Sequence, residues 1–227
     1  MTLPPVTLRP APEDGVWRLG LAHDPLVYNQ VEPETVMGSA AGRFSLFSYG
    51  MLYCASAPAG CYAEALAPFR VDPRVRDLMG DAATGGTGLM AVGDLASSWR
   101  AERILVRLVP SPQARFLDVE TEQTRRALAA LLKDELRELN LQGPLENHHI
   151  HGPNRGIARQ IAAWAVAQRN SDGHQSIQGI TYRSSYGRRQ CWAILRDTEL
   201  KEEERRPIRL EDVDLHDVAR EYGLTVR

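Results

Sequence analysis

The stretch AGRFSLFSYGMLYCASAPAGCYAEAL, residues 41–66, decides the fold, because a strand pattern and a helix pattern follow one another within it. MLYCA at 51–55 is a short apolar run rich in strand formers, and it predicts a buried strand. SAPAGCYAEALAPF then predicts a helix, with Ser56 as its cap, Pro58 in its first turn and Pro68 at its end.

Three polar residues stand out in this otherwise small and apolar segment: Arg43, Tyr53 and Glu64. A carboxylate on an apolar helix is costly to bury unless it is paired, so Glu64 requires a partner such as Arg43. Gly42 precedes Arg43 and lets a ligand or another backbone approach closely. Two interpretations remain open: a structural Arg–Glu pair beside an ordinary strand tyrosine, or three walls of a binding site.

Further strands and helices are expected on both sides of this segment. Strands are predicted at 16–22, 102–110 and 114–119 and in IQGITYRSS and QCWAILRD, and helices at 120–139, at 155–168 and in DVDLHDVAREYGL, capped by Asp212 and ended by Gly223. The Gly- and Ser-rich residues 80–98, ENHHIHGPN and the charged ELKEEERRP are expected to be loops or connectors. Strands and helices intersperse without a strict βαβ rhythm, which favours an α+β fold.

Composition limits the class of protein. At 227 residues the chain suits one domain, with residues 1–15, which hold four prolines, as an extended arm and residues 16–227 as the domain. A net charge of −2 gives no electrostatic reason to expect direct nucleic acid binding. No apolar run approaches the roughly 20 residues of a membrane span, and the N-terminus lacks the layout of a secretory signal. Three cysteines without a CxxC pair fit free thiols in a reducing cytoplasm.

Two other clusters suggest chemistry of a different kind. His148, His149 and His151 could contribute to a metal site with Glu146, but without a helical HExxH motif a solvated loop is the preferred interpretation. Cys61 could be a nucleophile with one of these histidines as its base, although its apolar helix favours a small core residue. GGTG at 85–88 lacks the lysine that a phosphate-binding loop requires.

The order and spacing of the polar residues resemble the RES domain family, which is named for an arginine, a glutamate and a serine. The family's glycine-arginine-aromatic step stands here as GRF with Arg43, its Leu-Tyr-small strand as MLYCA with Tyr53, and its helix as CYAEAL with Glu64. The spacings are ten residues from Arg43 to Tyr53 and eleven from Tyr53 to Glu64, as in the family. GITYRSSYGRRQCWAIL resembles the family's serine segment and places its serine at Ser184.

The resemblance extends over residues 16 to 225. Arg18 in VWRL matches the arginine on the first strand of the family's domain. Phe44 stands where many members have tryptophan, and Ser185 follows Ser184 where the family often has arginine. Ser185 therefore stays an alternative for the family serine.

This resemblance implies an ADP-ribosyltransferase-like core of mixed and antiparallel strands flanked by helices, and it implies NAD as the substrate. Members of the family break the nicotinamide–ribose bond with water or phosphate as acceptor, or transfer ADP-ribose to a protein. By the resemblance, Glu64 stabilises the developing positive charge on the ribose, and Arg43 and Arg18 bind the pyrophosphate. Tyr53 stacks on nicotinamide, Ser184 fixes the ribose, the carboxamide or Glu64, and no metal is required.

The family also implies a biological setting. Its members are the toxins of type II toxin–antitoxin modules, and many are held by a helix-turn-helix antitoxin whose tail blocks the NAD cleft. We therefore expect a cytoplasmic toxin in a heteromeric complex, with the oligomeric state left open. A degenerate domain that binds or regulates without catalysis is the alternative from another class.

Overall fold

The structure is a computed structural model that describes residues 5–30, 42–47, 49–70, 74 and 93–227. Within them, eight strands form one sheet in the order β1-β6-β7-β8-β3-β2-β5-β9. Their bounds in that order are Leu8–Pro10, Arg115–Asp118, Gly179–Arg183, Gln190–Leu195, Met51–Ala55, Val16–Leu21, Arg103–Pro110 and Leu200–Pro207. Neighbouring strands run antiparallel except for β6 and β7, which are parallel. The fold is α+β, as predicted.

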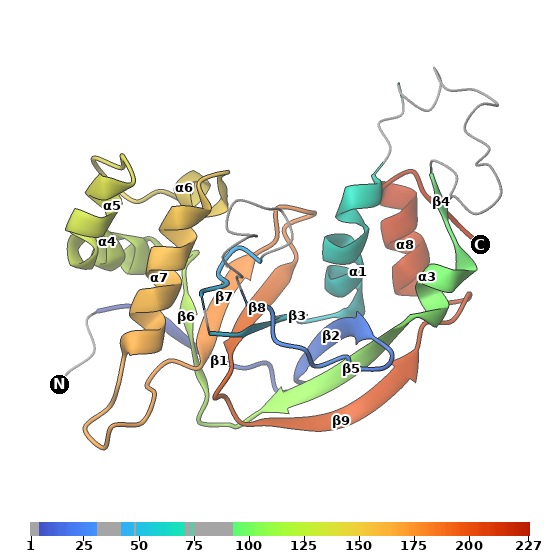
Figure 1. The fold of residues 1–227 in the computed structure, drawn as a ribbon, viewed down its shortest axis with the longest axis horizontal. Helices are drawn as coiled ribbons and strands as arrows, with labels where there is room; N and C mark the ends of the chain where they lie inside the picture. The colour runs from blue at the N-terminus through green and yellow to red at the C-terminus, as the bar shows by residue number, and fades with distance from the viewer. Residues whose placement is uncertain (1–4, 31–41, 48, 71–73, 75–92) are drawn as a thin grey trace.

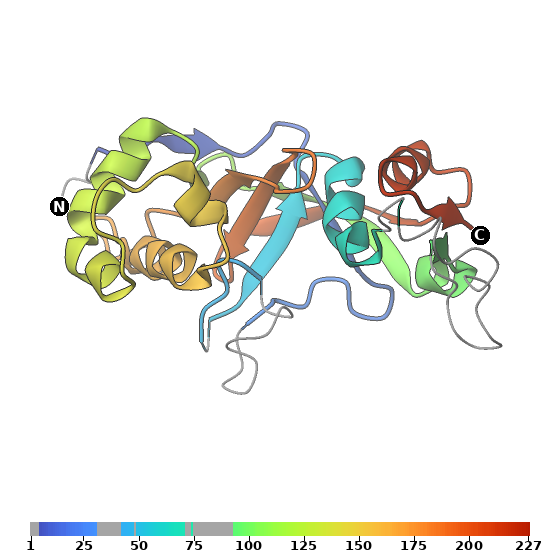
Figure 2. The ribbon, with the colours of Figure 1, turned by 90° about the horizontal axis from the view of Figure 1, so that it is seen from above.

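The helices lie on one side of this sheet in two groups (Figures 1 and 2). One group is α4 (Glu122–Leu131), α5 (Lys133–Glu138), α6 (Asn147–His151) and α7 (Arg155–Ala167); the other is α1 (Pro58–Leu66), α3 (Ser97–Ala101) and α8 (Val213–Glu221). A 3₁₀ turn, η2 (Ala67–Phe69), follows α1, and β4 (Asp94–Leu95) pairs in parallel with β10 (Thr225–Val226). None of the helices in the described ranges is long and apolar enough to cross a membrane.

Strand β3 lies in the middle of the sheet and is covered on both faces. Met51 and Ala55 belong to the core beneath the helices, whereas Leu52 and Cys54 belong to a second apolar cluster. Successive strand residues point to opposite faces, so this alternation places Tyr53 on the helix side. Burial on both faces explains why the strand reads as an uninterrupted apolar run.

Strands β2 and β3 are joined at one residue pair, Trp17 with Ala55. Beyond that pair, the Arg18 side chain takes the place of a strand partner: its Nη1 donates to the Tyr53 carbonyl at 3.0 Å, and its Nε donates to the Pro25 carbonyl at 3.4 Å. The buried carbonyl is thereby satisfied where the ladder ends. Strands β2 and β3 are therefore not paired along the rest of their length, next to the start of α1.

Several predicted elements differ from the structure. ELKEEERRP, predicted to be a surface connector, contains the edge strand β9, and the predicted helix 120–139 is divided at Leu132, whose backbone leaves helical geometry. Residues 80–92 of the predicted Gly-rich loop lie outside the described residues, and the end of that segment contains β4 and the start of α3. Residues 8–10 of the predicted arm are extended and pair with β6.

The start of α1 also differs from the prediction. Ala57, not Ser56, is the N-cap residue, and no side chain caps the helix there. The Ser56 hydroxyl instead accepts a hydrogen bond from Trp192 Nε1 at 2.9 Å. Pro58 lies in the first turn as predicted, where its missing N–H costs the helix nothing.

Helix α8 is capped by Asp212, as predicted, and the side chain of this cap residue makes a second contact. Asp212 Oδ1 accepts from the Leu215 N–H at 3.2 Å, and Oδ2 accepts from the hydroxyl of the fully buried Tyr62 at 2.9 Å. We expect Asp212→Ala to lower the free energy of unfolding by about 1–3 kcal/mol, since it removes a cap and leaves a buried hydroxyl unpaired. Urea denaturation would measure the loss.

Asp217→Ala on the exposed side of the same helix is the matched control. Asp217 is 57% exposed and forms a surface pair with Arg220 at 3.1 Å, so its loss should cost under about 0.5 kcal/mol. Equal effects of the two substitutions would show that the Asp212 contacts do not stabilise the domain.

Candidate active site

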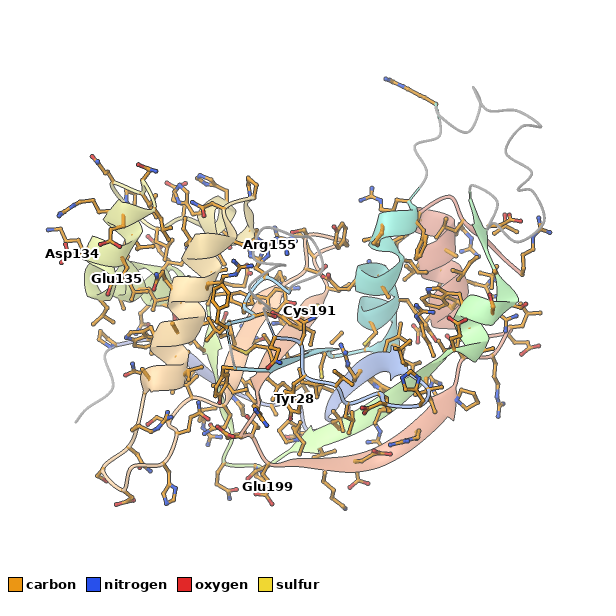
Figure 3. The ribbon with its side chains drawn as sticks, in the orientation of Figure 1. Tyr28, Asp134, Glu135, Arg155, Cys191 and Glu199 are labelled. Atoms are coloured by element: carbon orange, nitrogen blue, oxygen red, sulfur yellow. The ribbon has the colours of Figure 1, made fainter. Side chains whose placement is uncertain are left out.

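A cavity of about 460 Å³ is lined by residues of the central strands β2, β3 and β7 and of helices from both groups, α1, α6 and α7. Figure 3 shows Arg155 and Cys191 in this region, whereas Asp134 and Glu135 lie on the outer surface of α5. The polar and aromatic residues that line the cavity come from several strands, helices and connecting segments: Arg18, Asn29, Arg43, Tyr53, Glu64, His151, Arg155, Tyr182, Ser185 and Tyr186. The cavity thus collects side chains from most of the length of the chain.

The Glu64 carboxylate accepts a hydrogen bond from a serine hydroxyl in the turn between β7 and β8. Ser184 Oγ donates to Glu64 Oε1 at 2.5 Å and accepts from the Tyr186 N–H at 2.9 Å. Ser184 is 2% exposed, so its hydroxyl is fixed by these two contacts. Of the roles predicted for Ser184, this geometry supports the one in which it orients Glu64.

The environment of Glu64 changes the acidity of its carboxyl group. Burial against the cavity wall raises the pKa of Glu64, and the hydrogen bond from Ser184 and the charge of Arg43 act in the opposite direction. The net result is a pKa above that of an ordinary glutamate. Glu64 is nevertheless exposed at the open side of the cavity, where a ligand can reach it.

Arg43 does not pair directly with Glu64 but ties the loop after Gly42 to helix α6. Its Nη1 donates to the carbonyls of Ile150 at 3.0 Å and Gly152 at 2.8 Å. Burial lowers the pKa of Arg43, although nearby acidic groups oppose this. The guanidinium stays charged, as arginine does in proteins. The direct ion pair considered from the sequence is therefore replaced by a clamp on the backbone around His151.

Tyr53 anchors the same loop through its hydroxyl group. The hydroxyl accepts from the Phe44 N–H at 2.9 Å and lies 3.0 Å from Ser45 Oγ. Burial raises the pKa of Tyr53 to about 12, so the phenol stays protonated. Its ring is part of the cavity lining.

Gly42 permits this arrangement because a side chain there would collide with the tyrosine. A Cβ atom at Gly42 would lie 2.2 Å from the Tyr53 ring carbons. We expect Gly42→Ala to displace the ring or the loop and to lower the free energy of unfolding by about 1–3 kcal/mol. Urea denaturation would measure this, and an unchanged midpoint would contradict the close contact.

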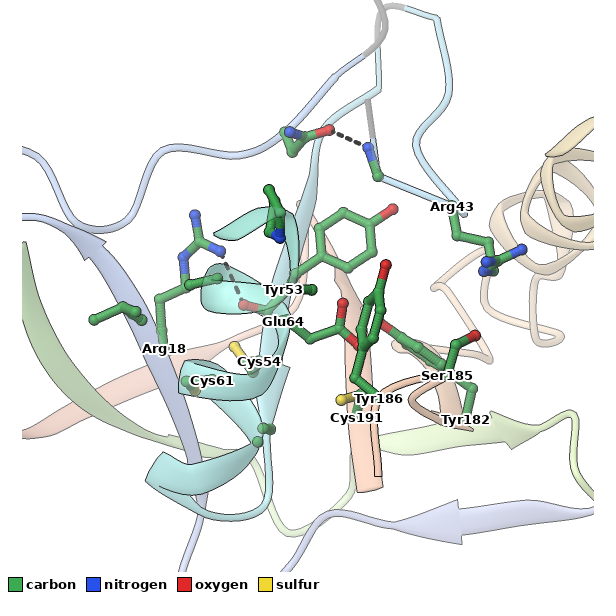
Figure 4. A pocket seen from close by; sticks show the side chains of 18 of the residues that line it. Arg18, Arg43, Tyr53, Cys54, Cys61, Glu64, Tyr182, Ser185, Tyr186 and Cys191 are labelled. Atoms are coloured by element: carbon green, nitrogen blue, oxygen red, sulfur yellow. Dashed lines mark hydrogen bonds between the residues drawn. The ribbon is translucent and has the colours of Figure 1, made fainter. Parts of the chain in front are cut away.

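Figure 4 shows how the remaining side chains surround Glu64. Arg18 and Arg43 lie on opposite sides of Tyr53, and the Tyr186 ring stands next to the Glu64 carboxylate. Tyr182 lies on the side of Arg43 and packs against Phe44 with ring centroids 5.1 Å apart. Tyr182, Tyr186 and Arg155 were not predicted as site residues. The two tyrosines flank the predicted serine segment, and this proximity was the available signal.

A second cavity of about 450 Å³ adjoins the first. Its lining residues are Glu146, Asn147, His148, His151, Arg183, Ser184, Ser185 and Arg188. His151 and Ser185 line both cavities. Ser184 lines the second cavity and donates a hydrogen bond to Glu64, which lines the first. Ser184 and Ser185 thus take different positions: the first contacts Glu64, and the second lines the first cavity.

The segment HHIH is a short helix where a loop was predicted, and its three histidines do not form one cluster: the rings of His148 and His149 lie 3.9 Å apart, whereas His151 contacts Glu120. His149 Nδ1 accepts from the Glu146 N–H in a capping box at the start of α6, and His148 lies 3.2 Å from Glu146 on the surface. His151 turns to the cavity and contacts Glu120 at 2.8 Å. Across the described ranges there is no group of three or more residues arranged to hold a metal.

Cys61 is a core residue, in agreement with the preferred interpretation from the sequence. It is 7% exposed, and its thiol donates to the Trp17 carbonyl at 3.0 Å. Burial raises the pKa of Cys61 to about 12, so the thiolate needed for nucleophilic attack is scarce at neutral pH.

Comparisons with known proteins place the chain in a family. No curated protein matches it. A similar solved structure is the M. tuberculosis MbcT–MbcA toxin–antitoxin complex, at 15% sequence identity, with 95% of this chain and 92% of that chain covered and a TM-score of 0.48. The model of the RES domain matches residues 15–216, and the chain therefore belongs to the RES domain family.

Proposed function

We propose that this RES domain protein is an NAD-consuming toxin that cleaves the bond between nicotinamide and ribose. The observation that carries the proposal is the Glu64 carboxylate, oriented by Ser184 at 2.5 Å inside the cavity that Arg18, Arg43 and Tyr53 line. A cavity of about 460 Å³ is within the range of small-molecule sites.

The chemistry suits a fixed carboxylate. Breaking the nicotinamide–ribose bond passes through an oxocarbenium-like ribose, as in glycoside hydrolysis. Glu64 would stabilise the positive charge that develops on the sugar or hold its hydroxyl groups. Nicotinamide leaves as a neutral molecule, so the departure needs no proton donor and no metal.

The other residues would bind the parts of NAD that do not react. Arg43 and Arg18 would contact the pyrophosphate, and the Tyr53 ring would stack on nicotinamide. Each arginine uses Nη1 for a main-chain carbonyl, which fixes the guanidinium before a ligand arrives. Such preorganisation reduces the entropic cost of binding a charged ligand.

Membership of the family supports the biological setting of the proposal. RES domain toxins act on NAD and are held by cognate antitoxins, so we propose a heteromeric complex with a helix-turn-helix antitoxin in the cytoplasm. The alternative acceptors are water, phosphate and a target protein.

Incubation of the purified protein with NAD, followed by mass spectrometry of the products, tests the proposal. Free nicotinamide together with ADP-ribose, ADP-ribose phosphate or a modified protein would identify the acceptor as water, phosphate or protein. If NAD and all added proteins remain unchanged after the antitoxin is removed, the proposed function is wrong.

A further inference from the structure

Glu120 and His151 form a second pair of polar side chains at the cavity, separate from Glu64 and Ser184. His151 Nε2 lies 2.8 Å from Glu120 Oε1, and the same oxygen accepts from the Arg183 N–H at 2.9 Å. The two side chains are only 16% and 17% exposed. A nearly buried pair of this kind has a defined geometry, unlike the surface pair of His148 with Glu146, whose side chains are 70% and 59% exposed.

The main chain around His151 is fixed as well. Arg43 Nη1 donates to the carbonyl before His151, at Ile150, and to the carbonyl after it, at Gly152. Arg43, from the loop after Gly42, thus fixes the backbone on either side of His151, and Glu120 fixes its ring.

The contact with Glu120 determines which ring nitrogen carries a proton. Burial alone would raise the pKa of Glu120, but the hydrogen bonds from His151 and the Arg183 N–H lower it below the ordinary value. Glu120 is therefore ionised at neutral pH and can only accept, so His151 must donate from Nε2. In the neutral ring Nδ1 is then left with a lone pair, which is the state of a general base.

The position of His151 relates this base to the proposed reaction. His151 lines the first cavity together with Glu64 and the second together with Ser184 and Ser185. A neutral nucleophile in either cavity can therefore contact the imidazole of His151.

We propose that His151, positioned by Glu120 and Arg43, is the general base that activates a neutral hydroxyl acceptor, with water as the simplest case. This inference rests on the proposed function and specifies its second substrate. In the step, the C1′–N bond breaks and its electron pair leaves with nicotinamide. The acceptor oxygen forms the new bond to C1′, and its proton passes to Nδ1 and then to solvent.

His151→Gln with added azide tests the proposed base. Glutamine can still contact Glu120 but cannot take the proton, so kcat for hydrolysis should fall about 100-fold with little change in KM. Azide is an anion that attacks without losing a proton. It should raise the turnover of the His151→Gln variant at least about tenfold and yield ADP-ribosyl azide.

Glu120→Gln tests the positioning residue. The amide oxygen can keep both contacts while the charge is lost, so kcat should fall about tenfold with KM unchanged, and azide should again restore turnover. His174→Gln, on the exposed loop before β7, is the matched control and should behave like the wild type. Thermal unfolding of each variant checks that the fold is retained.

The outcomes separate this inference from the function on which it rests. Hydrolysis by the wild type, loss in His151→Gln and rescue by azide support the inference. Wild-type hydrolysis with an unaffected His151→Gln variant, or a loss that azide does not restore, overturns it and leaves the NAD-cleaving function standing. Absence of nicotinamide release from the wild type overturns both.

Discussion

Glu64→Gln is expected to reduce NAD cleavage by at least about 1,000-fold, because it removes the carboxylate charge that would stabilise the proposed ribose cation. Glutamine has nearly the same shape, and its amide oxygen can still accept the hydrogen bond from Ser184 Oγ. Burial disfavours the ionised carboxyl of Glu64, so the neutral variant should be no less stable than the wild type. Release of nicotinamide and thermal unfolding would measure the two effects.

Glu135→Gln supplies a matched control for this substitution. Glu135 lies on the outer surface of α5, away from the cavity (Figure 3). The control should cleave NAD at the wild-type rate. Comparable turnover by Glu64→Gln would remove the central element of the proposed function.

Ser184→Ala is expected to lower NAD turnover by about 100-fold, since Glu64 loses the hydroxyl that orients it and the Tyr186 N–H loses its acceptor. The substitution should also change the pH dependence. The carboxylate of Glu64 is the active form, so activity falls as the pH drops through its pKa. The Ser184 hydrogen bond lowers that pKa, and its removal should move the acid limb of the pH–rate profile to higher pH.

Ser185→Ala tests which of the two adjacent serines lowers the pKa of Glu64. Ser185 lines the cavity, but the contact to Glu64 comes from Ser184. The acid limb should therefore stay in place when Ser185 is replaced. A shift caused by Ser185→Ala, with Ser184→Ala unchanged, would reverse the assignment of the family serine.

The strongly patterned parts of the fold could be predicted from the sequence. MLYCA correctly predicted the central strand β3. The leucines of 120–139 correctly predicted a helical segment, although the backbone at Leu132 divides that segment into α4 and α5. Strand β9 was missed because most of its residues are charged and show no alternation of apolar and polar side chains. As an edge strand it is stabilised by pairs such as Arg107 with Glu204 at 3.3 Å, and such pairs cannot be seen in one segment alone.

The residues of the candidate site also fall into a part that the sequence predicts and a part that depends on the tertiary fold. Arg43, Tyr53, Glu64 and Ser184 were predicted from spacing and family resemblance, and the structure brings all four to one cavity or to its wall. The clamp from Arg43 to α6 was not predictable, because its partners are backbone carbonyls that any residue offers. Glu120 was missed for a related reason: an acidic residue before a helix is ordinary, and its contact with His151 depends on the tertiary fold.

The distances along the chain between these contacts have a consequence for synthesis. Arg43 is 109 residues from its partner Gly152, and Glu64 is 120 residues from Ser184. A growing chain can therefore make the first contact only after α6 has left the ribosome, and the second only after β7 has followed. Domains acquire such long-range contacts late, when the chain is nearly complete. An unfinished polypeptide should accordingly have no NAD-cleaving activity, so the toxic property would arise only once almost the whole domain has been made.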